Sequence, residues 1–119
     1  MAFVSNSITY TQVAIPFQNG METMGIKIDD VHIVNVYNPP NNDLDTTVLN
    51  QMVRQRKIII CGDFKSHHGM WGSLSMDAIG RTLVSFIESN ENVVLNTSTP
   101  THFYAVGAGL WIILDLSIV

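Results

Sequence analysis

Charge and cysteine are both scarce in this chain of 119 residues. Charged residues make up 13% of it and hydrophobic residues 46%, a balance that favours a folded core and excludes a disordered chain. Six Lys and Arg against ten Asp and Glu give a formal net charge of -4, so the chain lacks the broad basic surface typical of nucleic-acid binders. Cys61 is the only cysteine, which excludes an internal disulfide, and we predict that it is a small core residue.

Membrane and nucleotide-binding signals are missing too. The first residues have neither the basic nor the apolar region of a signal peptide, and no apolar run approaches the roughly 20 residues that cross a bilayer, so we expect no membrane partner. A glycine-rich phosphate loop and a Gly-x-Ser-x-Gly turn are also absent. We therefore expect no small-molecule cofactor.

The remaining pattern alternates between strand-like and helix-like segments, which predicts one mixed α/β domain over residues 1–119. The chain stops at Val119 inside an apolar run, which we interpret as a fragment of a longer domain. Strands are predicted at 9–15, 26–28, 31–36, 57–62, 93–96 and 111–119, with Asp29-Asp30 as a hairpin turn, loops at 65–76 and 97–101, and helices after Asp43 and after Asp77.

The segment from Lys57 to His68 carries the strongest functional signal. Ile58–Ile60 is continuously apolar, as in a strand of a parallel sheet that is covered on both faces. Asp63 follows Gly62 at the end of this strand, and Lys65 comes two residues later. Open α/β sheets place their chemistry at the carboxyl ends of strands, so this order predicts an active-site edge. The alternative is that Asp63 merely forms a turn.

Two more positions could contribute to such a site. Asp115 is the only charge in the apolar run 110–119, and a buried charge needs a partner or a ligand. The alternative is that Asp115 faces outward on an edge strand. Tyr37 and Asn38 follow another strand, where a phenol could donate to a phosphate oxygen or simply pack on the prolines that follow.

Metal chemistry at this edge would not be that of zinc. His67 and His68 are adjacent on an extended segment, so their side chains point to opposite sides, and no spaced His or Cys set accompanies them. The chemistry open to Tyr, Asn, Asp and His at strand ends is metal-assisted hydrolysis of a phosphoester.

Four segments of the sequence form a recognisable set. They are HIVNVYNPP (His32–Pro40), IIICGDFKSHHGMWGS (Ile58–Ser73), GRTLVSFIESNENVVLNTSTPTHF (Gly80–Phe103) and LDLSIV (Leu114–Val119). Together they resemble the endonuclease/exonuclease/phosphatase family, and within it the endonuclease domain of non-LTR (LINE-type) retrotransposon polyproteins. The resemblance covers nearly the whole chain, with the segments in the family's order and spacing.

This resemblance implies a four-layered α/β sandwich, two packed mixed β-sheets flanked by helices, here incomplete. It implies nicking of DNA with Mg²⁺ or Mn²⁺, which primes reverse transcription. Tyr37 matches the family's phosphate-binding tyrosine, and Asp63 the aspartate that orients or deprotonates the attacking water. Lys65 stands where the family has an asparagine that contacts the scissile phosphate, and Asp115 matches an aspartate near the metal and the catalytic histidine.

Three departures from the family pattern accompany the match. The family's metal-binding glutamate has no equivalent in residues 1–20, and neither Glu22 nor Glu88 has the context to replace it. The terminal Ser-Asp-His motif does not occur either, so the chain resembles a domain truncated at both ends. Lys65 is the third departure: lysine accepts no hydrogen bond, and its charge repels a divalent cation. Only Asp63 is then left as a possible metal ligand.

The leading hypothesis is therefore a DNA endonuclease domain that is weakly active or inactive in this copy. A phosphatase or nuclease acting on another phosphoester and a non-catalytic α/β module are the alternatives. The expected partners are DNA and a covalently linked reverse transcriptase domain, with an intracellular and nuclear location for the full-length element.

Overall fold

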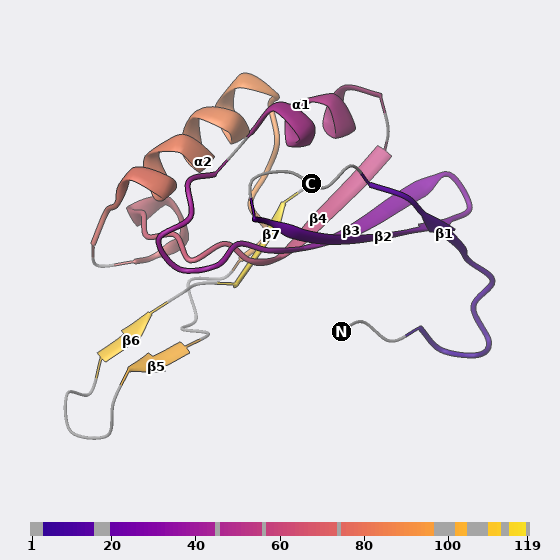
Figure 1. Cartoon of the computed structure of the whole chain (residues 1–119), viewed down its shortest axis with the longest axis horizontal. Coiled ribbons are helices and arrows are strands. Elements are labelled where there is room, and N and C mark those ends of the chain that lie inside the picture. The colour runs from indigo at the N-terminus through magenta and orange to yellow at the C-terminus, as the bar shows by residue number, and fades with distance from the viewer. Residues whose placement is uncertain are drawn as a thin grey trace.

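The computed structural model describes residues 4–15, 20–44, 46–55, 57–73, 75–96, 102–104, 110–112 and 115–118. They form a five-stranded mixed sheet with two helices on one face, and a separate two-stranded sheet lies apart from it (Figure 1). The strands of the larger sheet lie in the order β1 (Thr11–Val13), β2 (Glu22–Ile28), β3 (Val31–Tyr37), β4 (Lys57–Asp63), β7 (Asp115–Ile118). The other elements are α1 (Thr46–Gln55), a 3₁₀ turn (Gly69–Trp71), α2 (Ala78–Ser89), β5 (His102–Tyr104) and β6 (Leu110–Ile112).

The predicted hairpin is confirmed. β2 and β3 pair antiparallel along their full lengths, and Asp29 and Asp30 form the turn between them. Asp29 has φ of +53°, a left-handed conformation that Asp and Asn tolerate better than most residues. β2 begins at Glu22, several residues before the predicted strand.

β3 and β4 are parallel neighbours, joined by the crossover that contains α1. The predicted central strand is confirmed and runs one residue further than expected, through Asp63. Because parallel strands end at the same edge of a sheet, the residues that close β3 and β4 lie side by side.

The main core lies between the sheet and the helices. Alternate residues of β3 and β4 face α1 and α2, as the two-residue period of a strand requires. Phe64 and Trp71, from the segment after β4, are fully buried in the same core. Its strand members are Val34, Val36, Ile58 and Ile60, and its helix members are Leu49, Met52, Leu83, Phe86 and Ile87.

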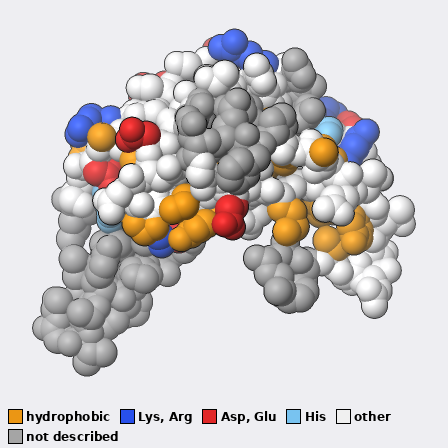
Figure 2. All heavy atoms as spheres, viewed as in Figure 1, with side chains coloured by type: hydrophobic (Ala, Val, Ile, Leu, Met, Phe, Trp, Pro, Cys, Tyr) orange, Lys and Arg blue, Asp and Glu red, His pale blue; other side chains and the backbone are white. Residues whose placement is uncertain are grey.

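The opposite face of the sheet is only partly covered by the described residues. Figure 2 shows hydrophobic side chains exposed along the side of the molecule away from the helices. A cavity of about 360 Å³ lies there, lined by Met24, Ile26, Ile28 and Ile33 together with the N-terminal residues Val4, Ile8 and Tyr10. Cys61 also lines this cavity and is half-buried. The prediction that it is a residue of the main core is therefore wrong. We predicted that β4 is covered on both faces. In the described structure the helices cover one face, and the other face borders the cavity.

Two predictions about the second half of the chain are wrong. Residues 93–96 are not a strand, because only Val94 makes an isolated bridge. The run 111–119 is not one strand, since Trp111 pairs within β5–β6 while β7 pairs with β4. β5 was not foreseen, and the loop predicted at 97–101 lies outside the described residues.

The described residues supply one helix layer and one sheet layer of the expected α/β architecture. The second sheet and second helix layer of a four-layered sandwich are not among them. In the described part of the chain, neither helix has the length and apolar character needed to span a membrane.

Candidate functional site

Three of the predicted site residues lie in one cross-strand row. Tyr37 closes β3, Asp63 closes β4, and Asp115 opens β7, which runs antiparallel to β4. The sheet register places Tyr37 beside Asp63 and Asp63 beside Asp115. The register thus brings these three positions, far apart in the sequence, to one edge of the sheet, and their roles in a site stay predictions.

Glu22 extends the same row. It opens β2, and its register partner is Tyr37 on β3. Sequence context had set Glu22 aside, but strand pairing places its exposed side chain at the site's margin. Glu88 lies in the last turn of α2 and is not part of the row.

Gly62 lets β4 approach β3 closely just before Asp63. Its φ is +143°, and a Cβ atom at this position would lie 1.8 Å from the carbonyl oxygen of Val36. No side chain fits such a gap, so only glycine allows this backbone path. The Gly-Asp pair is thus a structural unit, in which the glycine sets the position of the aspartate.

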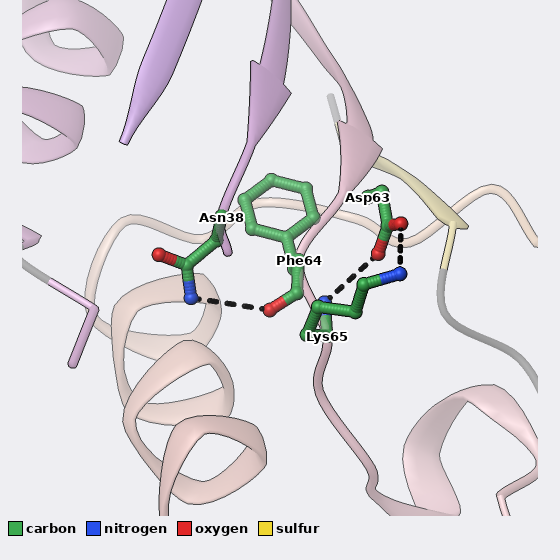
Figure 3. A network of polar contacts seen from close by, with 4 residues as sticks. All are labelled: Asn38, Asp63, Phe64 and Lys65. Atoms are coloured by element: carbon green, nitrogen blue, oxygen red, sulfur yellow. Dashed lines mark hydrogen bonds and ion pairs between the residues drawn. The ribbon is translucent and has the colours of Figure 1, made fainter. Parts of the chain in front are cut away.

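Asn38 joins the segments that follow the two parallel strands. Its side chain is completely buried, and its Nδ2 donates to the carbonyl oxygens of Phe64 at 3.3 Å and of Asn42 at 3.1 Å (Figure 3). Its backbone N–H donates to the carbonyl oxygen of Asp63 at 2.8 Å, and its Oδ1 accepts from Asn42 Nδ2 at 2.8 Å. Asn38 therefore fixes the two consecutive carbonyl groups that directly follow the Asp63 side chain.

Lys65 engages both oxygens of the Asp63 carboxylate. Its backbone N–H donates to Oδ1 at 3.1 Å, and its Nζ lies 2.5 Å from Oδ2 (Figure 3). The two side chains are 26% and 24% exposed, so the ion pair is partly sheltered from water. Lys65 has φ of +49°, the left-handed region that asparagine enters more readily than lysine.

The loop after Lys65 is held by the start of α2. Asp77 caps this helix as predicted, because its Oδ1 accepts from Gly80 N at 2.6 Å. The same oxygen accepts from His67 N at 3.1 Å. Nδ1 of the neighbouring His68 accepts from Met70 N and caps the 3₁₀ turn, which leads into the buried Trp71. His67 thus serves the loop's structure through its backbone N–H, and His68 through its side chain.

The described residues do not fit a divalent metal ion. Among them, no three His, Cys, Asp or Glu side chains gather closely enough to hold one. Asp63, the possible ligand, already has both oxygens engaged by Lys65. Hard divalent cations need several oxygen ligands, and the site offers an ammonium group beside the carboxylate instead.

The fold and the row of polar residues at the ends of its strands define an α/β protein whose candidate site lies at one edge of the sheet. A solved structure, titled "Endonuclease domain of TRAS1, a telomere-specific non-LTR retrotransposon", has a similar fold, with a TM-score of 0.68 and 19% sequence identity. The match covers 96% of this chain and 56% of that one, so the present chain spans little more than half of the solved domain.

The family follows from a separate comparison. The model of the endonuclease-reverse transcriptase family matches residues 31–119, and the chain belongs to this family. The resemblance seen in the sequence is thereby confirmed at the level of the family. No protein with curated annotation matches the chain.

Asn38 is the residue whose importance the sequence did not reveal. It had been grouped with Tyr37 as a possible phosphate contact, yet its amide is turned inward and fully used in loop contacts. The signal was present in the run of asparagines around Pro39 and Pro40, which predicted a loop but not a buried amide.

Proposed function

We propose that this chain is part of a DNA endonuclease domain of a non-LTR retrotransposon, and that its family reaction is hydrolysis of a DNA phosphodiester bond. The observation that carries the proposal is the row Tyr37–Asp63–Asp115 at the edge of the sheet. Family membership supports the reaction class, and the row supports the location of the site.

The residues would divide the reaction as follows. The phenol of Tyr37, 38% exposed, is placed to donate a hydrogen bond to a phosphate oxygen. The carboxylate of Asp63 would orient the attacking water and accept its proton, as general bases do. Asp115, beside Asp63 in the register, would hold a second negative charge at the same edge.

We propose that this copy is weakly active or inactive. Lys65 contacts both oxygens of Asp63 and so competes with a water molecule or a metal ion for this carboxylate. The family's reaction is expected to use Mg²⁺ or Mn²⁺, and the described residues do not fit such an ion.

The partly covered face of the sheet supports the wider architecture. A face lined by Met24, Ile26, Ile28 and Ile33 is what the interior of a two-sheet sandwich presents, and the second sheet of a four-layered domain would cover it. DNA as the substrate, a linked reverse transcriptase and a nuclear location belong to this proposal for the full-length element.

A plasmid-nicking assay in Mg²⁺ tests the proposal on the chain and on a chimera. In the chimera, this chain replaces the matching part of the TRAS1 endonuclease domain. We expect near-background nicking by the chain, and nicking by the Lys65→Asn chimera that Asp63→Ala abolishes. Nicking by the unmodified chain that Asp63→Ala abolishes would contradict the inactivity. A folded Lys65→Asn chimera with no nuclease activity would contradict the function.

The Lys65–Asp63 pair also favours a second candidate, a non-catalytic α/β module. Such a module would melt sharply at a temperature that Mg²⁺ does not change, and its Lys65→Asn chimera would remain inactive. Turnover of abasic, supercoiled and RNA substrates by the chimera would separate the DNA endonuclease from an enzyme acting on another phosphoester.

A further inference from the structure

The Lys65–Asp63 contact joins two residues that are only two positions apart. A carboxylate normally offers its oxygens to several partners, but here one residue supplies both donors, at 3.1 Å to Oδ1 and 2.5 Å to Oδ2. The second contact is a charge-assisted hydrogen bond, the stronger kind. The side chain of Lys65 is thus folded back over the end of β4.

The backbone makes this return possible. Lys65 adopts a left-handed conformation, with φ of +49°, immediately after Phe64. Phe64 is fully buried, and its carbonyl oxygen is held by Asn38 Nδ2. Asn38 also holds the carbonyl oxygen of Asp63, so the backbone on which the ion pair stands is fixed at two points.

The electrostatics of the ion pair exclude a second cation. The Lys65 ammonium and a divalent ion would compete for the same carboxylate oxygens, and like charges at such separations repel strongly where water is partly excluded. Both side chains are about three-quarters buried, which reduces the screening of this repulsion. A metal ion could reach Asp63 only after the ammonium had left.

We propose that Lys65 is the built-in counter-cation of Asp63: its ammonium takes the place of a divalent metal ion at this carboxylate, so the Asp63 carboxylate is neutralised and held in place without metal. The disagreement between the family's expected metal and the described residues then has a specific local cause. The proposal stands apart from DNA cleavage, because ion binding reports on it and nicking does not.

The exposed pair Lys57–Asp30 provides a matched control. It has a similar contact, 2.6 Å between Lys57 Nζ and Asp30 Oδ2, but its side chains are 73% and 67% exposed. Removing Lys57 also frees a carboxylate without opening a sheltered site. Any gain in metal binding that comes merely from losing a positive charge will appear in this control as well.

Mn²⁺ titration monitored by NMR tests the proposal on the full chain. Paramagnetic broadening of the Phe64 and Lys65 amides would be measured in the wild type, Lys65→Asn, Lys65→Met and Lys57→Asn. We expect Mn²⁺ to bind near Asp63 roughly tenfold more tightly in both Lys65 variants, since removal of an adjacent unit charge is worth about that factor. Adding Asp63→Asn to Lys65→Asn should abolish the gain, and Lys57→Asn should show no gain at these amides.

Two results would overturn the proposal. One is equal broadening at Phe64 and Lys65 in the wild type and the Lys65 variants. The other needs no variant: a wild-type melting temperature that EDTA lowers and Mn²⁺ restores would show that metal already occupies the site. A wild-type melting temperature unchanged by either supports the proposal.

Discussion

The side-chain amide of Asn38 donates to the carbonyl oxygen of Phe64 at 3.3 Å and so joins the residues that follow the two parallel strands. This bond lies beneath the candidate site, in a region without exposure to water. The site's geometry therefore depends on a residue that does not face it.

Replacing Asn38 with Ala should lower the free energy of unfolding by about 2–3 kcal/mol, because buried carbonyl groups lose their donor. Urea denaturation would measure this. Asn6→Ala is the control: Asn6 is exposed in the N-terminal segment, and its loss should have little effect. An equally small effect of Asn38→Ala would mean that the hydrogen bonds of the Asn38 side chain do not stabilise the loops after β3 and β4.

Gly62→Ala should destabilise the chain by about 3 kcal/mol or more, because the new Cβ collides with backbone and the positive φ disfavours alanine. Gly69→Ala is the matched control, since a Cβ there meets nothing within 4 Å and the backbone has no positive φ. Thermal melting of both variants gives the comparison. Similar melting temperatures would contradict the close approach of β4 to Val36.

The two faces of the sheet should respond differently to a new charge. Val36 is fully buried beneath the helices, whereas Met24 on the opposite face is 44% exposed. We expect Val36→Glu to unfold the chain, because it buries an unpaired carboxylate. Met24→Glu should change stability by only about 0.5 kcal/mol and reduce the binding of the dye ANS to the apolar face. Unfolding by Met24→Glu would show that this face is covered.

Cys61 should make stability fall at alkaline pH. Burial raises the pKa of its thiol above the ordinary value of 9.0. Because the pKa of the thiol is higher in the folded state than in the unfolded state, its contribution to the free energy of unfolding is complete below the unfolded-state pKa. That contribution is lost as the pH rises from the unfolded-state pKa through the folded-state pKa. The difference in unfolding free energy between the wild type and Cys61→Ser should therefore shrink above pH 9.0. A difference independent of pH would contradict the thiol's burial.

The sequence predicted the elements whose pattern is local. The Asp29-Asp30 hairpin, the isoleucine strand and the Asp77 cap depend on short-range turn, strand and capping preferences, and all are present. Local preferences could not show that the run 111–119 belongs to two strands. Its first part pairs with β5 and its last part with β4, and such pairing depends on residues that are distant in the sequence.

The positions of the candidate residues were more predictable than their contacts. The family pattern pointed to Tyr37, Asp63 and Asp115, and parallel pairing explains why the ends of β3 and β4 coincide. The burial of the Asn38 side chain depends on its rotamer. The two hydrogen bonds from Lys65 to the Asp63 carboxylate depend on the left-handed backbone at Lys65. The sequence pattern encodes neither. Glu22 entered the row through strand register alone.

The pairing of β4 with β7 gives the site an order of assembly. β2, β3 and β4 come early in the chain, so Tyr37 and Asp63 can become neighbours while the ribosome is still adding α2, β5 and β6. Asp115 joins only when a long loop closes, a step whose entropic cost grows with the length of chain enclosed. The pairing of Tyr37 with Asp63 therefore encloses a shorter stretch of chain than the pairing of Asp63 with Asp115.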